Sequence, residues 1–237
     1  MAKSRPGRLI VIDGADGSGK ATQTKLVRTA LVKMGYKVKT IDFPQYENNF
    51  FGKLVQRFLR GEMGDFIAYD PHVASVLYAA DRFESSEKIK DWLEKGFIVI
   101  CDRYVSANQI HQGGKIHDSA KRTSFLRWLD KMEYGIFKIS KPDIVVYLNV
   151  AIEISEKLLD KRIKQQSALG KVSKRDLAEE NKQHLVESRA SALKLIQNSN
   201  KWAKIECAPE GDLLPRDVIR DLIIARIKRT LPKIKRS

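Results

Sequence analysis

The chain has few cysteines, no long apolar run and a shortage of acidic residues. Its two cysteines, Cys101 and Cys207, each end a short apolar run, so we expect buried free thiols rather than a disulfide. No apolar stretch approaches the ~20 residues that a membrane-spanning helix needs. The first residues pass from a basic stub directly into a strand pattern, without a targeting segment. The sequence therefore predicts a cytoplasmic protein that is not bound to a membrane.

Basic residues outnumber acidic residues, 44 Lys and Arg against 29 Asp and Glu, which gives a formal net charge of +15. Such a charge attracts nucleic acid, acidic lipid or nucleotide phosphates, and charge alone does not choose among them. The basic residues are spread along the chain, with some concentration in 157–175 and at the C-terminus. A solvated surface and a basic tail account for this pattern, so nucleic acid is an unlikely partner.

Short apolar, β-branched runs alternate with longer stretches of helical periodicity. The expected strands are residues 8–13, 38–43, 97–101, 143–150 and, more weakly, 201–207. The expected helices include residues 22–34, 71–94, 119–134, 152–165 and 176–196. This alternation predicts an α/β fold with a parallel five-stranded sheet and helices on both faces. Ligands bind outside the carboxyl ends of such strands, so we expect the chemistry just after each strand.

No internal repeat or Pro-rich linker divides the 237 residues, and 43% hydrophobic content is enough for one substantial core. We therefore expect a single domain over 1–237, with a basic N-terminal stub at 1–7 and a basic tail at 228–237. Residues 165–175 are polar, basic and poorly periodic, which predicts a mobile loop.

A glycine-rich segment directly follows the first expected strand. Residues 14–20, Gly-Ala-Asp-Gly-Ser-Gly-Lys, match the phosphate-loop pattern G-x-x-x-x-G-K at a strand-to-helix junction. Glycines let the backbone N–H groups turn inward on a phosphate, while the helix N-terminus and Lys20 supply positive charge. The expected ATP-binding residues are Gly14, Ala15, Asp16, Gly17, Ser18, Gly19, Lys20, Ala21 and Thr22.

The expected magnesium site departs from the usual pattern, because Ala21 stands where Ser or Thr normally offers a hydroxyl to Mg²⁺. Either Thr22 substitutes, or nucleotide phosphates, water and a carboxylate from another strand hold the metal. Asp102, at the end of the expected strand 97–101, can organise the metal directly or through water. Arg103 follows it and can grip a phosphate with its planar two-point fork. We expect Mg²⁺ with ATP as the phosphoryl donor.

Four stretches together resemble the thymidylate kinase family of P-loop nucleoside monophosphate kinases: residues 12–24, 42–65, 77–84 and 102–115. The last, DRYVSANQIHQGGK, is the most family-specific, and the resemblance extends over nearly the whole chain. It implies a P-loop NTPase-type fold with a mobile lid. It also implies transfer of the γ-phosphoryl group of ATP to dTMP, giving dTDP and ADP for dTTP synthesis, and a homodimer.

The resemblance also implies roles for single residues. Arg103 and Arg82 resemble the acceptor clamps: the former binds the monophosphate and the latter reaches the base carbonyl or the phosphate. Tyr78 resembles an aromatic that stacks on thymine, and Asn108 a residue that reads the pyrimidine N3 edge. His111 falls where relatives crowd the ribose 2′ position, which would favour deoxyribose, although a purely structural role fits the sequence equally well. The expected dTMP-binding residues are Asp16, Phe43, Tyr46, Tyr78, Arg82, Arg103, Asn108 and His111.

The phosphate loop lacks a basic residue at its variable positions, and phosphoryl transfer needs a cation at the migrating group. Kinases of this type resemble one another in supplying it from a lid, expected here at about 158–175. Of the basic residues in that segment we expect Arg162 to serve, although a merely solvated basic loop is also consistent with the sequence. The expected catalytic residues are Lys20, Arg103, Asp16 and Arg162.

Two other functions remain open at this point. A kinase for another nucleoside monophosphate would share the phosphate loop and differ in the base pocket. A noncatalytic, nucleotide-dependent binder of nucleic acid would explain the charge of +15, but it would not need the segment at 102–115.

Overall fold

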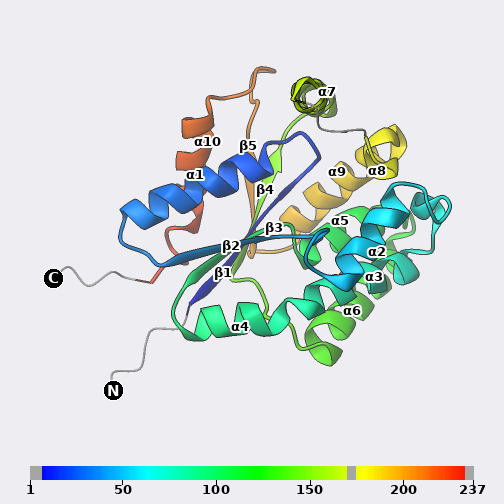
Figure 1. The fold of residues 1–237 in the computed structure, drawn as a ribbon, viewed down its shortest axis with the longest axis horizontal. Helices are drawn as coiled ribbons and strands as arrows, with labels where there is room; N and C mark the ends of the chain where they lie inside the picture. Colours follow the sequence, from blue (N-terminus) through cyan, green and yellow to red (C-terminus); the bar gives the residue numbers. More distant parts are fainter. Residues whose placement is uncertain (1–6, 170–174, 233–237) are drawn as a thin grey trace.

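The computed structural model describes residues 7–169 and 175–232. Its centre is one parallel sheet in the order β2-β3-β1-β4-β5 (Figure 1). The strands are β1 (Arg8–Gly14), β2 (Val38–Asp42), β3 (Ile98–Asp102), β4 (Ile144–Asn149) and β5 (Trp202–Glu206). All the strands expected from the sequence are therefore present, close to their expected bounds.

Helices connect and cover the strands. They are α1 (Lys20–Lys33), α2 (Phe50–Leu59), α3 (Pro71–Glu84), α4 (Ser86–Glu94), α5 (Val105–Gly114), α6 (Ser119–Asp130), α7 (Ile152–Ala168), α8 (Leu177–Glu180), α9 (Lys182–Gln197) and α10 (Arg216–Ile227). A 3₁₀ turn, η1 (Phe66–Ala68), and a π-helical turn, η2 (Lys131–Ile136), complete them. Among the described residues, no helix has the length and apolarity needed to cross a bilayer.

The sheet is buried on both faces, as its continuous apolar strands require. Leu9 and Val11 of β1 turn to one face and pack with residues of α3 to α6. Ile10 and Ile12 turn to the other face and pack against α1 and α10. Figure 1 shows α1 and α10 on one side of the sheet and α4, α5, α6 and α9 on the other. The carboxyl ends of the strands therefore meet at one edge between two helical layers.

The single helix expected over residues 71–94 is wrong, because the chain breaks between α3 and α4 at Ser85. The amide of Asn49, which precedes α2, donates to the Asp81 carbonyl at 2.8 Å and to the Ser85 hydroxyl at 3.1 Å. That carbonyl is the one to which the Ser85 N–H would bond in an unbroken helix, and the N–H bonds instead to Arg82 O. A side chain inserted into the helical ladder thus ends α3.

The expected helix over 119–134 also changes character near its end. The α-helical pattern ends at Asp130, and η2 continues it with a wider turn. This turn carries Glu133, whose side chain is fully buried. The helix expected over 176–196 is likewise divided, into α8 and α9, with Asn181 capping the second helix by accepting from the His184 N–H at 2.9 Å.

Candidate active site

The phosphate loop runs from the end of β1 to the first turn of α1. Gly17 and Gly19 have φ angles of 82° and 87°, in the left-handed region where a side chain is strained. A Cβ at Gly17 would also lie 2.1 Å from the Ser155 carbonyl oxygen of α7, so the loop can pack there only with glycine. The sequence needs glycine at these positions to shape a phosphate cradle at the N-terminus of α1.

Lys20 turns its side chain back into this loop. Its ammonium donates to the carbonyl oxygens of Gly14 and Ala15, both at 2.9 Å, and lies 3.4 Å from the Asp16 carboxylate. The side chain is largely buried. The positive charge therefore already lies at the centre of the loop, bonded to oxygen atoms that phosphate oxygens can replace.

Asp16 and Arg103 join the phosphate loop to the end of β3. Arg103 Nη2 donates to Asp16 Oδ1 at 2.5 Å. Burial opposes ionisation of Asp16, but Arg103 and Lys20 outweigh it and hold its pKa well below the usual range. Arg103 has a φ angle of 64°, which is uncommon for a residue with a side chain and is often found at functional sites. Its backbone N–H bonds to Ile12 O at 3.0 Å, which fixes this conformation against β1.

Acidic side chains at the strand ends provide oxygen atoms near the phosphate loop. Asp102 pairs in register with Ile12 of β1, and burial raises its pKa although Lys20 and Arg103 oppose the rise. Asp13 accepts from the Ser106 hydroxyl at 2.5 Å.

The fit of this region to magnesium depends on its donor atoms. The residues around Lys20 offer oxygen donors only, the type that Mg²⁺ prefers, but Ala21 has none, Thr22 is half-buried, and the described residues contain no group of three or more acidic, His or Cys ligands. This set fits a metal held chiefly by nucleotide oxygens and water.

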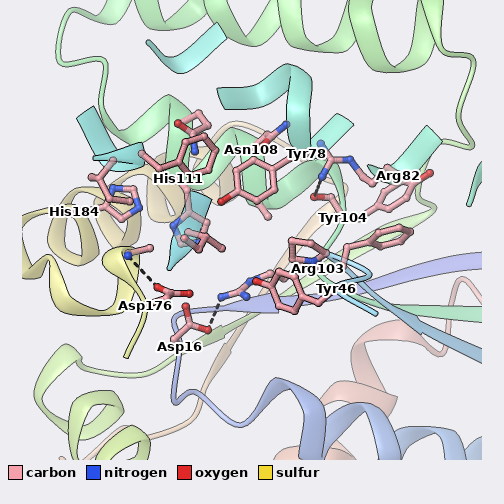
Figure 2. Close-up of a pocket in the computed structure, with 18 residues that line it drawn as sticks. Asp16, Tyr46, Tyr78, Arg82, Arg103, Tyr104, Asn108, His111, Asp176 and His184 are labelled. Atoms are coloured by element: carbon pink, nitrogen blue, oxygen red, sulfur yellow. Dashed lines mark hydrogen bonds and ion pairs between the residues drawn. The ribbon is translucent and has the colours of Figure 1, made fainter. Parts of the chain in front are cut away.

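A pocket opens beside Arg103 at the carboxyl ends of the strands, where ligands bind in parallel sheets of this kind. All of the residues expected at dTMP line it, which brings together side chains from the phosphate loop, the segment after β2, α3, the segment after β3 and α5 (Figure 2). They are Asp16, Phe43, Tyr46, Tyr78, Arg82, Arg103, Asn108 and His111. In Figure 2, Asp16 and Arg103 lie across the pocket from Tyr78, Asn108 and Arg82.

Arg82 is held firmly in the wall of the pocket that lies opposite Asp16 and Arg103. Its side chain is 2% exposed and makes a two-point ion pair with Glu133 of η2, with distances of 2.5 Å and 2.7 Å. A third bond joins Arg82 Nη1 to the Tyr104 carbonyl at 3.3 Å. Burial opposes the charge on Arg82, yet the Glu133 carboxylate leaves its pKa above the ordinary value. Arg82 is therefore a fixed cation in the pocket wall.

The sequence interpretation missed several residues around His111. His184 of α9 stacks on His111 with ring centroids 5.4 Å apart, and Ser188 lies 3.0 Å from His111 Nδ1. Burial is the main cause that lowers the pKa of both rings, to about 4 for His184, so both are neutral at pH 7. Only the tertiary packing of α9 on α5 brings this pair together, and the sequence carries no local sign of it.

Asp176 was also missed as a pocket residue. It caps α8 in a box with Glu179, a pattern of Asp and Glu three residues apart that the sequence does display. Its carboxyl lines the pocket. Burial, and then repulsion from Glu179, raise its pKa to about 6.

The expected lid at 158–175 begins in α7, as the expected helix over 152–165 implies. α7 ends at Ala168, three residues beyond the expected end of that helix, so the loop expected over 165–175 does not begin before 169. Arg162 is half-exposed and pairs with Glu179 at 3.1 Å, while Arg175 pairs with Asp160 at 2.7 Å. Lys171 and Lys174 lie outside the described residues. In this arrangement Arg162 is bonded to α8 and not to the phosphate loop.

Comparison with known proteins points to one family. A family model described as thymidylate kinase matches residues 12–212. The chain is 31% identical over 147 residues to thymidylate kinase of Mycobacterium tuberculosis, covering 62% of this chain and 68% of the relative. It is 33% identical over 161 residues to the probable thymidylate kinase of Thermococcus gammatolerans, covering 66% and 72%. For thymidylate kinase of Homo sapiens the identity is 29% over 149 residues, covering 63% and 64%.

The fold has a solved counterpart as well. The structure of thymidylate kinase from Candida albicans aligns with a TM-score of 0.70 at 22% identity, covering 95% of this chain and 92% of that chain. The predicted P-loop NTPase-type sheet with helices on both faces is therefore confirmed.

Proposed function

Because the chain belongs to the thymidylate kinase family, we propose that it transfers the γ-phosphoryl group of ATP to dTMP, giving dTDP and ADP. The observation that carries the proposal is the Asp16–Arg103 ion pair. It lies where the phosphate loop meets the pocket, so a donor on the loop and an acceptor in the pocket would meet at these two side chains.

The donor side uses the loop from Gly14 to Thr22. Backbone N–H groups and the N-terminus of α1 would bind the phosphates, and Lys20 would exchange its bonds to Gly14 and Ala15 for bonds to phosphate oxygens. Asp102 and Thr22 are the residues that would help to hold Mg²⁺, which when bound with ATP supplies positive charge to the phosphate oxygens. Phosphoryl transfer is governed by such positioning and charge.

On the acceptor side, Arg103 would turn from Asp16 to the monophosphate, for which its planar fork is suited. Asp16, released from that pair, would orient the sugar 3′-hydroxyl. Tyr78 would stack on the base, while Asn108 and Arg82 would read its edge. The acceptor phosphate is already anionic, so alignment rather than a strong general base supplies much of the rate.

The lid and the pocket floor complete this scheme. We propose that Arg162 leaves Glu179 when both substrates are bound and reaches the migrating phosphoryl group, which closes α7 and α8 over the site. His111, with His184 behind it, would restrict the space beside the sugar and favour deoxyribose.

The experiment that tests the function is a coupled ADP-release assay with Mg-ATP and dTMP, run beside the other nucleoside monophosphates and a control without acceptor. We expect turnover with dTMP well above that with purine nucleotides. Strong preference for AMP would replace the base assignment, and no turnover with any acceptor would refute the kinase. Salt-sensitive DNA binding in that last case would favour the nucleic-acid alternative.

We further propose that residues 1–237 act as one unit and that two copies associate. The support for a dimer is an exposed apolar stripe on α3, formed by Val73, Val76 and Phe83, which are 53%, 42% and 50% exposed. Next to this stripe, the ring of Phe137 lies 5.1 Å from that of Phe83, and Ile136, which precedes Phe137, is 65% exposed. An apolar stripe of this kind suits a self-complementary two-fold contact. The cytoplasmic location expected from the sequence stays a prediction.

A further inference from the structure

Glu133 is a buried carboxylate behind the base pocket that no step of the proposed reaction uses. Its side chain is 0% exposed, and it does not line the pocket. It accepts from Arg82 at two nitrogens and from Asn108 Nδ2 at 3.2 Å. The π-helical turn η2 directs it inward, and such turns are frequent at functional sites. One carboxylate therefore contacts both side chains expected to read the base.

The contact between Glu133 and Asn108 helps to decide which way the Asn108 amide faces. Asn108 Nδ2 donates to the Ser75 carbonyl at 3.1 Å and to Glu133 Oε1 at 3.2 Å. Both partners only accept, so the opposite orientation would place the amide oxygen against two other oxygens. With both amide hydrogens used inward, Oδ1 is the atom left for the pocket. Asn108 thus presents an acceptor.

The same carboxylate also fixes Arg82. Its Nε and Nη2 bond to Glu133 and its Nη1 bonds to the Tyr104 carbonyl, which holds the guanidinium plane in the pocket wall. An arginine can only donate. Figure 2 shows Arg82 and Asn108 on the same wall, on either side of Tyr78. The wall therefore combines a fixed donor with a fixed acceptor.

We propose that Glu133 is a positioning residue that makes the pocket selective for a pyrimidine with an N3–H beside a carbonyl at C4. This inference rests on the proposed function. Thymine and uracil match the wall, because N3–H can donate to Asn108 Oδ1 and the C4 carbonyl can accept from Arg82. Cytosine presents an acceptor at N3 and an amino donor at C4. Its N3 would therefore face the acceptor Oδ1 of Asn108, and its amino group would face the donors of Arg82. Leaving such buried groups unpaired is what gives hydrogen-bonding sites their selectivity.

The test is Glu133→Gln, which keeps the shape of the side chain. A neutral glutamine has one acceptor oxygen in place of two, so it cannot keep both the two-point pair with Arg82 and the bond from Asn108. The Ser75 carbonyl then remains as the acceptor for the Asn108 amide, and both base-reading side chains are held less firmly. We expect the ratio of kcat/KM for dTMP to kcat/KM for dCMP to fall by about tenfold or more. The change should lie in KM, with kcat for dTMP within about threefold of wild type, because the phosphate clamp is unaltered.

The matched control is Asp81→Asn, which removes a buried carboxylate next to Arg82 in sequence but bonded to Gln45 and Asn49 instead. It should keep the dTMP-to-dCMP ratio of the wild type. A folded Glu133→Gln protein with an unchanged ratio, or a wild-type enzyme that uses dCMP as well as dTMP, would overturn the proposal while the kinase assignment stands. Absence of turnover with every pyrimidine nucleotide would instead refute the proposed function.

A second measurement keeps the proposal testable if Glu133→Gln does not fold. In the wild-type chain without nucleotide, the side-chain amide protons of Asn108 should be protected from solvent exchange, as shown by NMR of ¹⁵N-labelled protein. Addition of dTMP should leave them protected. Rapid exchange before dTMP is added, with protection only afterwards, would mean that the amide turns to the base and would overturn the proposal.

Discussion

The Lys20 ammonium donates to two carbonyl oxygens of the phosphate loop, and in the proposed reaction phosphate oxygens of ATP replace them. Lys20→Met removes that charge and should reduce kcat/KM by about a hundredfold or more, since a positioned cation at the phosphates contributes on that scale. Lys25→Met is the control, because Lys25 lies on the same helix with an exposed side chain. Coupled ADP release measures the effect and thermal unfolding checks the fold. Equal activity of the two variants would remove Lys20 from the mechanism.

Asp176 makes the stability of the fold depend on pH. Its pKa is raised from 3.8 to about 6 in the folded chain, so its ionisation destabilises the fold above pH 6, and this cost disappears as the pH falls toward 4. Asp176→Asn removes the charge and keeps a good helix cap. We expect the variant to melt about 4 °C above wild type at pH 8 and to lose that advantage near pH 4. Melting curves from pH 4 to 8 test this, and a difference that does not vary with pH contradicts it.

At the scale of elements, the sequence predicted the features that depend only on residues close together in the chain. The strands and the phosphate loop follow from short apolar runs and from the glycines at 14, 17 and 19, and all of these lie where expected. The break at Ser85 could not be read locally, because the side chain that causes it belongs to Asn49. In the site, Glu133 and His184 were missed for the same reason: each meets its partners only after distant helices pack together.

The break between α3 and α4 can be tested through that same side chain. Asn49→Ala leaves the Asp81 carbonyl and carboxylate without the donor that they share, and we expect a loss of about 1–3 kcal/mol in the free energy of unfolding. Asn48→Ala is the control, since Asn48 is exposed and its side chain bonds only to Gln45 among the described residues. Urea denaturation followed by circular dichroism compares the two. A loss no larger than in the control would mean that Asn49 does not hold the break.

At the scale of the whole molecule, the proposed dimer uses the exposed apolar residues of α3 and leaves those of α10 outside the contact. Val76 lies in the apolar stripe of α3, whereas Leu222 of α10, 40% exposed, lies on the other side of the sheet (Figure 1). Val76→Asp should convert the dimer to monomer at micromolar concentration, because two copies of the new charge would be buried at a two-fold contact. Leu222→Asp should leave the dimer intact. Sedimentation velocity distinguishes these outcomes, and a wild-type monomer, or loss of the dimer in both variants, would remove the α3 stripe as the contact surface.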